Sequence, residues 1–194
     1  MLTKLNYNRN RLMLKLGVSK TIDTAIEVGT WHGDFAATMI NALKPATFFA
    51  VDPLRIMPGL TSNPGDEFDS QDKLDRLAIE VTKRLQDQGH SLIRETSAVA
   101  ATQFKDNSLD LVYIDGDHSY ENCSSDINDW YIKVKENGIL CGHDYCWGHT
   151  GRNIPFGVIQ AVTELVEKHN LNLYTTNEEF ASWVIVKDNS KISL

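Results

Sequence analysis

The sequence predicts a three-layer α/β fold, in which a mostly parallel sheet of seven strands is covered by helices on both faces. Short apolar runs alternate with stretches of helical periodicity along most of the chain, which is typical of such folds. Glycines and acidic residues recur directly after the apolar runs, at the edge where parallel sheets bind ligands. A short polar link separates the last two runs and indicates a C-terminal antiparallel hairpin. The chain has 194 residues of ordinary apolar content, so we expect residues 1–194 to form a single domain.

The N-terminal part predicts a helical segment followed by a strand, a glycine turn and a second helix. Residues 1–20 are basic and partly amphipathic, so we expect a helical lead-in that either packs across the domain edge or forms a flap over the site. Residues 24–28 form the first strand. The glycine turn 29–33 leads into a helix over 35–43, which Pro45 ends.

The rest of the chain continues the alternation, apart from two irregular segments. Residues 53–70 hold three prolines and show no periodicity, and a loop of that length is uncommon unless it is functional or disordered. We expect it to be a substrate-side loop, and a Gly- and aromatic-rich loop over 145–154 to complete the substrate surface with it and the lead-in. The remaining strands are expected at 47–51, 91–95, 109–114, 138–142, 171–175 and 183–187, and the remaining helices at 71–88, 98–104, 119–135 and 156–169.

The glycine turn and the strand after it predict a ligand that contains a ribose. Gly29 and Gly33 let the backbone approach a ligand closely at a helix N-terminus. Asp52 ends the next strand about twenty residues beyond the turn, the spacing at which a carboxylate can take both hydroxyls of a ribose. The pattern is Gly-x-x-x-Gly, whereas a pyrophosphate favours Gly-x-Gly-x-x-Gly. A ligand with a ribose but no diphosphate therefore fits better than NAD.

Two acidic stretches predict a site at the same edge of the sheet. Asp115, Asp117 and His118 come directly after one apolar run, and His143 and Asp144 follow the next. Because the carboxyl ends of parallel strands meet at one edge, we expect these carboxylates and imidazoles to lie together.

These motifs resemble those of a known enzyme class. Residues 27–33, Glu-Val-Gly-Thr-Trp-His-Gly, resemble the first motif of class I S-adenosylmethionine-dependent methyltransferases, and Asp52 resembles their ribose-binding acid. Residues 113–121 and 138–145 resemble a branch of small O-methyltransferases related to catechol and macrocin-type sugar O-methyltransferases. The similarity covers roughly residues 22–187. It implies a Rossmann-like fold and methyl transfer from S-adenosylmethionine to a hydroxyl of a small molecule, such as a sugar, a phenol or a natural product.

The resemblance also implies which residues hold the cofactor. Its sulfonium is cationic, which suits the carboxylates at the strand ends. Thr96 departs from the acid that many relatives carry near this position. The implied cofactor contacts come from the glycine turn and the neighbouring strand ends: Glu27, Gly29, Thr30, Trp31, Gly33, Asp52, Thr96, Ser97 and Asp115.

Methyl transfer to a hydroxyl requires loss of a proton, by a base or by a metal that lowers the pKa of the hydroxyl. The resemblance implies Asp115 and Asp144 as ligands of Mg²⁺ or another divalent cation. Relatives carry a further acid or amide beside the second ligand, where this chain has His143 and Tyr145. Without a metal, His118 or His143 is the expected general base. Asp117 is a third candidate, resembling the acid of some sugar-methylating relatives.

Composition bears on the partners of the protein. A net charge of −7 argues against nucleic acid, and no apolar stretch is long enough to span a membrane. Three cysteines and the lack of an apolar N-terminal signal favour a cytoplasmic location, and the chain could form a homo-oligomer.

Two alternative functions for the chain are a nucleotide-cofactor oxidoreductase and a catalytically silent S-adenosylmethionine-binding protein. A zinc site is a further alternative, with four ligands at suitable spacing: Cys141, His143, Cys146 and His149.

Overall fold

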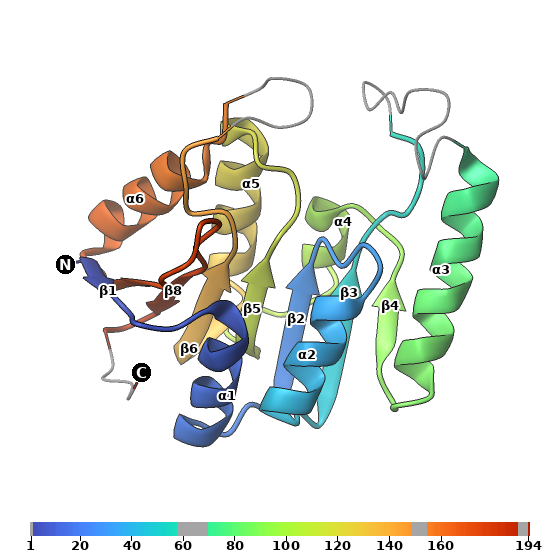
Figure 1. Ribbon diagram of the computed structural model, residues 1–194, viewed down its shortest axis with the longest axis horizontal. Helices are drawn as coiled ribbons and strands as arrows, with labels where there is room; N and C mark the ends of the chain where they lie inside the picture. The colour runs from blue at the N-terminus through green and yellow to red at the C-terminus, as the bar shows by residue number, and fades with distance from the viewer. Residues whose placement is uncertain (1, 58–69, 149–154, 190–193) are drawn as a thin grey trace.

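The computed structural model describes residues 2–57, 70–148, 155–189 and 194 (Figure 1). Their strands form one eight-stranded sheet in the order β1-β7-β8-β6-β5-β2-β3-β4, and β8 runs antiparallel to β6 and β7. The strands are β1 (Leu2–Lys4), β2 (Thr24–Val28), β3 (Thr47–Val51), β4 (Ser91–Ile93), β5 (Leu109–Ile114), β6 (Val134–Gly142), β7 (Leu173–Thr175) and β8 (Trp183–Val186). The helices are α1 (Arg9–Ser19), α2 (Asp34–Leu43), α3 (Gln71–Gln86), α4 (Ser97–Ala101), α5 (Tyr120–Tyr131) and α6 (Val158–His169).

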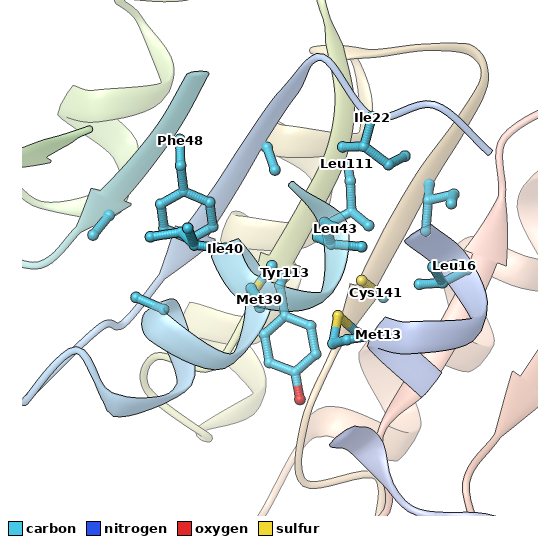
Figure 2. Packing of buried hydrophobic residues seen from close by; sticks show 14 of the residues in the cluster. Met13, Leu16, Ile22, Met39, Ile40, Leu43, Phe48, Leu111, Tyr113 and Cys141 are labelled. Atoms are coloured by element: carbon cyan, nitrogen blue, oxygen red, sulfur yellow. The ribbon is translucent and has the colours of Figure 1, made fainter. Parts of the chain in front are cut away.

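The predicted three-layer arrangement and the terminal hairpin are confirmed. The helices α1, α2 and α3 cover one face of the sheet, and α4, α5 and α6 cover the other (Figure 1). Each face has its own hydrophobic core; Figure 2 shows the one under α1 and α2. In β5, Leu111 and Tyr113 point into this core, while Val112 and Ile114 point into the opposite one. A central parallel strand buried on both faces therefore carries an unbroken apolar run.

The sheet has one strand more than the seven expected. Residues 2–4 were expected to belong to a helical lead-in, but they form β1, which pairs in parallel with β7. The Leu5 N–H continues this pairing by donating to the Thr175 carbonyl at 2.7 Å. Without β1, β7 would present unpaired backbone groups at the sheet edge, so the pairing is favoured by a partner that lies far away in the sequence. The helical part of the lead-in begins at Arg9, where the Asn8 side chain caps α1 by accepting from the Arg11 N–H.

A close helix crossing holds α1 against α2. A Cβ atom on Gly17 would lie only 2.3 Å from the Ala42 carbonyl oxygen, so glycine permits the backbones to approach. Leu12, Met13 and Leu16 are fully buried on this side of α1. The crossing fixes where the first turn of α1 lies relative to the carboxyl edge of the sheet.

Parts of both predicted substrate loops, residues 58–69 and 149–154, lie outside the described residues. Within the described segments, no helix has the length and apolarity that crossing a bilayer would require.

Candidate active site

The glycine turn is built against the end of β5. Gly29 has a φ of +87°, and a Cβ atom on it would lie 2.1 Å from the Asp115 carbonyl oxygen. Trp31 also has a positive φ, of 49°. The turn therefore takes a left-handed path that brings its backbone against the first residue of the acidic stretch.

Asp52 ties this turn to the end of β3. Its Oδ2 accepts the Trp31 N–H and its Oδ1 accepts the Leu54 N–H, both at 2.9 Å. Burial raises the pKa of Asp52, although the two backbone donors oppose the shift. The acid expected to bind the ribose thus also holds the loop on which a ribose would rest.

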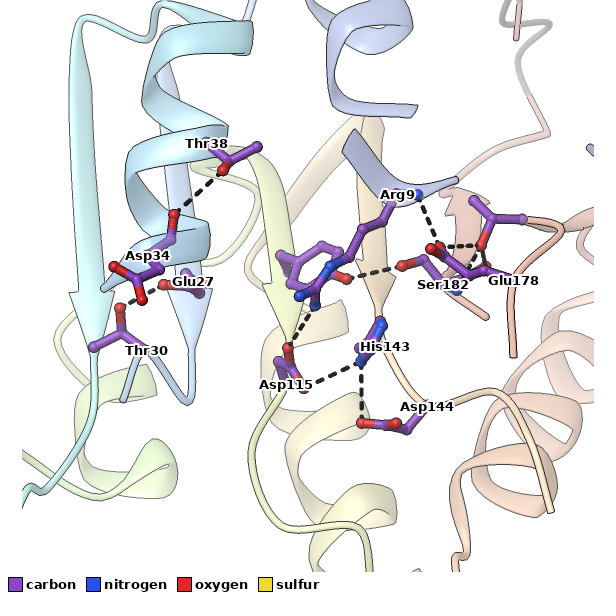
Figure 3. Close-up of polar contacts among 12 residues, drawn as sticks. Arg9, Glu27, Thr30, Asp34, Thr38, Asp115, His143, Asp144, Glu178 and Ser182 are labelled. Carbon is purple, nitrogen blue, oxygen red and sulfur yellow. Dashed lines mark hydrogen bonds and ion pairs between the residues drawn. The ribbon is translucent and has the colours of Figure 1, made fainter. Parts of the chain in front are cut away.

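Glu27 lies beneath the glycine turn and is 1% exposed. The Thr30 hydroxyl donates to its carboxylate (Figure 3). Burial raises the pKa of Glu27 to about 8, against the opposing effect of the Thr30 bond. The structure therefore places Glu27 inside the protein as a support of Thr30, while Gly33 ends the turn at the start of α2.

Thr96 and Ser97 lie where β4 passes into α4. The Thr96 carbonyl accepts the Ala100 N–H at 2.9 Å, as expected of a residue that starts a helix. Ser97 Oγ accepts the indole N–H of Trp130 at 2.8 Å and so connects α4 to α5. Both residues stand at the carboxyl edge of the sheet, but the Ser97 hydroxyl is already bonded to a core residue.

The two acidic stretches come together in a group of four side chains, which we call the Asp–His cluster: Asp115, His118, His143 and Asp144. Asp144 Oδ2 lies 2.6 Å from His118 Nε2 and 3.2 Å from His143 Nδ1. Asp115 Oδ1 lies 3.8 Å from each of the same ring nitrogens (Figure 3 shows the His143 contacts). The parallel register of β5 and β6, in which Ile114 stands beside Gly142, brings the two stretches level with each other.

Phe156 contacts the ring of His118, and Gly157 contacts its backbone. Its ring stacks on Phe156, with centroids 4.9 Å apart and planes inclined by 26°. Its carbonyl accepts the Gly157 N–H at 2.7 Å. A Cβ atom on Gly157 would lie 2.2 Å from Tyr120 Cα, so the segment before α6 packs directly on the start of α5. These contacts orient the imidazole toward the two carboxylates.

Two members of the Asp–His cluster, His118 and Asp144, have pKa values that their neighbours shift. Burial disfavours the imidazolium of His118, but the carboxylates of Asp115 and Asp144 outweigh it and raise the pKa of His118 to about 9. Burial likewise opposes ionisation of Asp144, yet the two imidazoles hold its pKa well below the usual range. The His118 Nε2 atom is buried, and among the described residues it has no acceptor in good hydrogen-bond alignment. Its short contact with Asp144 is therefore an attraction of charges rather than a linear hydrogen bond.

Three members of the cluster offer ligand atoms for a metal. One atom each from Asp115, His118 and Asp144 lie within 4.8 Å of one another. Two carboxylate oxygens and one imidazole nitrogen suit Mn²⁺, Fe²⁺ or Zn²⁺ better than Mg²⁺, which prefers oxygen ligands. The resemblance implied Asp115 and Asp144 as metal ligands. In the structure, His118 from the turn before α5 lies close enough to both to be a third candidate ligand.

Asp117 lies beside the cluster and is bonded within a turn. Its Oδ1 accepts the Ser119 N–H at 2.8 Å and also the Ser119 hydroxyl. Burial opposes ionisation of Asp117, but these bonds prevail and lower its pKa. Asp117 thus stabilises the turn that leads into α5.

Sequence reasoning missed Arg9, which reaches the site from α1 (Figure 3). Its Nη1 lies 3.5 Å from Asp115 Oδ2, on the side of that carboxylate away from Oδ1 and the histidines. The sequence shows only that the lead-in is basic, and no local pattern links residue 9 to residue 115. Among the zinc candidates, Cys141 is buried in β6 and its thiol donates to the Val112 carbonyl, while His149 lies outside the described residues.

Comparison with curated proteins gives two relatives. The chain is 25% identical to an uncharacterized protein of Acanthamoeba polyphaga mimivirus over 122 residues, which are 63% of this chain and 51% of that protein. It is 32% identical to an uncharacterized protein of Sinorhizobium fredii over 74 residues, 38% of this chain and 8% of that protein. The chain thus spans about half or less of the length of these relatives.

Solved structures share the fold at low identity. An O-methyltransferase family protein from Burkholderia thailandensis aligns with a TM-score of 0.64 and 13% identity, over 94% of this chain and 56% of that one. A methyltransferase from Geobacter sulfurreducens aligns with a TM-score of 0.60 and 12% identity, over 95% and 80%. A spermidine synthase from Thermotoga maritima aligns with a TM-score of 0.56 and 10% identity, over 92% and 59%. Identities this low show the fold alone.

The family is shown by the sequence itself. Residues 26–145, which run from β2 to the end of the Asp–His cluster, match a family described as a methyltransferase domain. The match contains the glycine turn, Asp52 and both acidic stretches. The chain therefore belongs to this methyltransferase family, and its fold is the Rossmann-like fold of the methyltransferases above.

Proposed function

We propose that this protein transfers the methyl group of S-adenosylmethionine to a hydroxyl of a small molecule, and that the Asp–His cluster activates the hydroxyl. The observation that carries the proposal is the meeting of two carboxylates and two imidazoles beside the glycine turn. Asp144 Oδ2 lies within 3.2 Å of both ring nitrogens. Such a group can hold a hydroxyl and accept its proton next to a methyl donor.

The cofactor would lie across the ends of β3, β2 and β5. Asp52 would bind the ribose hydroxyls. The backbone of the Gly29 turn would approach the ribose and the part of the cofactor that links it to the amino-acid end, and Asp115 would face that end. Thr96 and Ser97 would border the adenine through their backbone. In this placement the Asp115 carboxylate would lie nearest the cationic sulfonium, and its charge would favour binding.

A divalent cation fits the donor set of Asp115, His118 and Asp144. When bound there, it would lower the pKa of a substrate hydroxyl that it contacts. His143 would then be the group that takes the hydroxyl proton, and Asp144 would stabilise the imidazolium that forms. If no cation binds, His118 is the alternative base at a pH above its pKa of about 9, where its imidazole is neutral. Asp117 is a third candidate, and its carboxylate is bonded to Ser119.

The acceptor would enter at the carboxyl edge of the sheet, where two indole rings are exposed. Trp147, which follows β6, is 86% exposed, and Trp31 in the glycine turn is 48% exposed. Exposed indole rings at the mouth of a site can stack on a flat or ring-shaped acceptor, which supports a phenol or a sugar.

The test is a turnover assay that measures S-adenosylhomocysteine with a panel of phenols, catechols and sugars, in EDTA and with added Mn²⁺ or Mg²⁺. We expect turnover with a hydroxylated acceptor, at least tenfold faster with Mn²⁺ than in EDTA. Methylation confined to amines or thiols would contradict hydroxyl transfer. Equal rates in EDTA and with added Mn²⁺ would show that turnover needs no cation. The proposal that a side chain of the cluster acts as the general base would then still stand. Calorimetry with S-adenosylmethionine and NAD completes the test, because tighter binding of NAD would refute the proposal.

A further inference from the structure

Arg9 brings a guanidinium from α1 to the edge of the Asp–His cluster. It opens α1, and its guanidinium lies over the Phe35 ring at 4.4 Å from the centroid. Its Nη1 is 3.5 Å from Asp115 Oδ2, and its side chain is 33% exposed (Figure 3). An arginine thus lies over an aromatic ring, beside a carboxylate, at the carboxyl edge of the sheet.

The contact with Asp115 is longer than a closed ion pair. Arginine–carboxylate bonds are usually about 2.7–2.9 Å and often bidentate. Here one nitrogen approaches one oxygen at 3.5 Å, and among the described residues the guanidinium makes no other hydrogen bond or ion pair. As far as the described segments show, most of its five N–H donors are therefore left for a ligand.

The guanidinium is not needed to hold the N-terminal segment in place, because backbone groups do so. The Arg9 N–H donates to Glu178 Oε1 at 2.8 Å. The Leu5 N–H donates to the Thr175 carbonyl at 2.7 Å, and the Tyr7 carbonyl accepts the Asn177 N–H at 3.0 Å. A structural role for this segment therefore leaves the charged end of Arg9 unexplained.

The position of Arg9 matches one end of the proposed cofactor. The strand order β5-β2-β3 places Asp115, the Gly29 turn and Asp52 in a row along the sheet edge. A ligand with its ribose on Asp52 that crosses the Gly29 turn ends at Asp115. In S-adenosylmethionine that end is a zwitterion, with an ammonium and a carboxylate on one carbon. A carboxylate and a guanidinium 3.5 Å apart present both complementary charges there.

We infer that Arg9 binds the carboxylate of the cofactor's amino-acid end, while Asp115 Oδ2 takes the ammonium. This inference rests on the proposed function. It makes Arg9 a specificity residue, because a cofactor analogue without the carboxylate gains nothing from the guanidinium. The two carboxylate oxygens of Asp115 then have different roles: Oδ2 binds the ammonium, while Oδ1 faces His118 and His143 in the Asp–His cluster.

The test measures the affinity of three ligands by calorimetry in EDTA: S-adenosylmethionine, its decarboxylated analogue, and 5′-methylthioadenosine, which lacks the amino-acid end. Each is titrated into the unsubstituted chain and into Arg9→Met. We expect Arg9→Met to weaken S-adenosylmethionine by about 10- to 100-fold, the range for a charged hydrogen-bonded contact, and to change the other two by less than about threefold.

Two further variants separate charge from structure. Arg11→Met makes the same substitution at an exposed position of α1 and should leave all three affinities unchanged. Arg9→Lys keeps the charge without the planar fork and should lie between the unsubstituted chain and Arg9→Met. Equal weakening of all three ligands by Arg9→Met, or no weakening of S-adenosylmethionine, would overturn the inference. Failure of the unsubstituted chain to bind S-adenosylmethionine at all would instead overturn the proposed function, and this inference with it.

Discussion

The two halves of the site are built in different ways. On the side of β2 and β3, the half that we propose for the cofactor consists of backbone: the Gly29 turn, its contact with the Asp115 carbonyl, and two N–H groups fixed by Asp52. On the side of β5 and β6, the half that we propose for the acceptor consists of titratable side chains, and the pKa values of His118 and Asp144 are shifted by their neighbours. A backbone site tolerates few changes of shape, whereas a side-chain site tolerates changes of shape and few changes of charge. Four substitutions test this difference.

The largest effect should follow a change of shape in the cofactor half. Gly29→Ala forces a Cβ atom to within 2.1 Å of the Asp115 carbonyl at a φ of +87°, so the turn and the acidic stretch must separate. We expect no measurable S-adenosylmethionine binding. Gly89→Ala is the matched control, because its φ is +79° but nothing lies within 4 Å of the new Cβ. It should cost about 1–2 kcal/mol of unfolding free energy and leave binding intact. Unchanged affinity in Gly29→Ala would refute the backbone description.

The next effect should follow a change of charge in the acceptor half. Asp144→Asn keeps the shape but removes the carboxylate that both imidazoles face. We expect kcat to fall by about 100- to 1000-fold with the cofactor Kd within about threefold, because an interaction made with the acceptor has been lost. NMR titration should show the pKa of His118 falling from about 9 toward its ordinary value. Glu121→Gln, in the exposed first turn of α5, is the control and should change neither. An Asp144→Asn enzyme of normal kcat would exclude the cluster from catalysis.

A smaller effect concerns the pH dependence of stability. The pKa of Glu27 is about 8 in the folded chain and near 4.5 when unfolded, so its stabilising contribution is present below pH 4.5 and is lost as the pH rises toward 8. Glu27→Gln can still accept the Thr30 bond but does not titrate. The variant should therefore gain unfolding free energy relative to the unsubstituted chain between pH 5 and 8, on the order of a few kcal/mol. Urea unfolding at several pH values measures this gain. A difference that stays constant with pH would show that Glu27 ionises normally in the fold.

The smallest effect concerns Ser97. Ser97→Ala leaves the buried indole N–H of Trp130 without its acceptor, which should lower the unfolding free energy by about 1 kcal/mol. S-adenosylmethionine affinity should change by less than about threefold, since the hydroxyl serves the α4–α5 contact and the backbone is unaltered. Ser125→Ala, exposed on α5, provides the reference for stability. A tenfold loss of affinity would place the Ser97 hydroxyl on the cofactor.

The difference between the halves also explains what the sequence could predict. The glycine turn and Asp52 lie within one strand–helix–strand unit, so local spacing sufficed to predict them. The meeting of Asp115 with Asp144 followed from the rule that parallel strands end at one edge. The same rule placed His118 near both carboxylates, but the orientation of its ring depends on the packing of Phe156 and Gly157, which no spacing reveals.

Two features lay beyond any reading of the sequence because their partners are distant. β1 exists because β7 offers a free edge about 170 residues later, and three residues carry too little strand preference to predict it. Arg9 reaches Asp115 because α1 crosses α2 at Gly17. In both cases tertiary contacts decide the conformation. The amphipathic pattern of residues 1–20 predicted only that a helix forms there, which is α1.

The docking of the N-terminal segment onto the C-terminal hairpin has a consequence for biosynthesis. Residues 2–9 are synthesised some 170 residues before their partners, β7 and Glu178. Closing so long a loop is entropically costly and depends on a hairpin that is already in place. The central strands can therefore assemble before the segment docks, and Arg9 can reach the site only once the segment has docked. Nascent chains that lack the hairpin would hold the glycine turn but not this cation, so tight cofactor binding would report that the whole domain has folded.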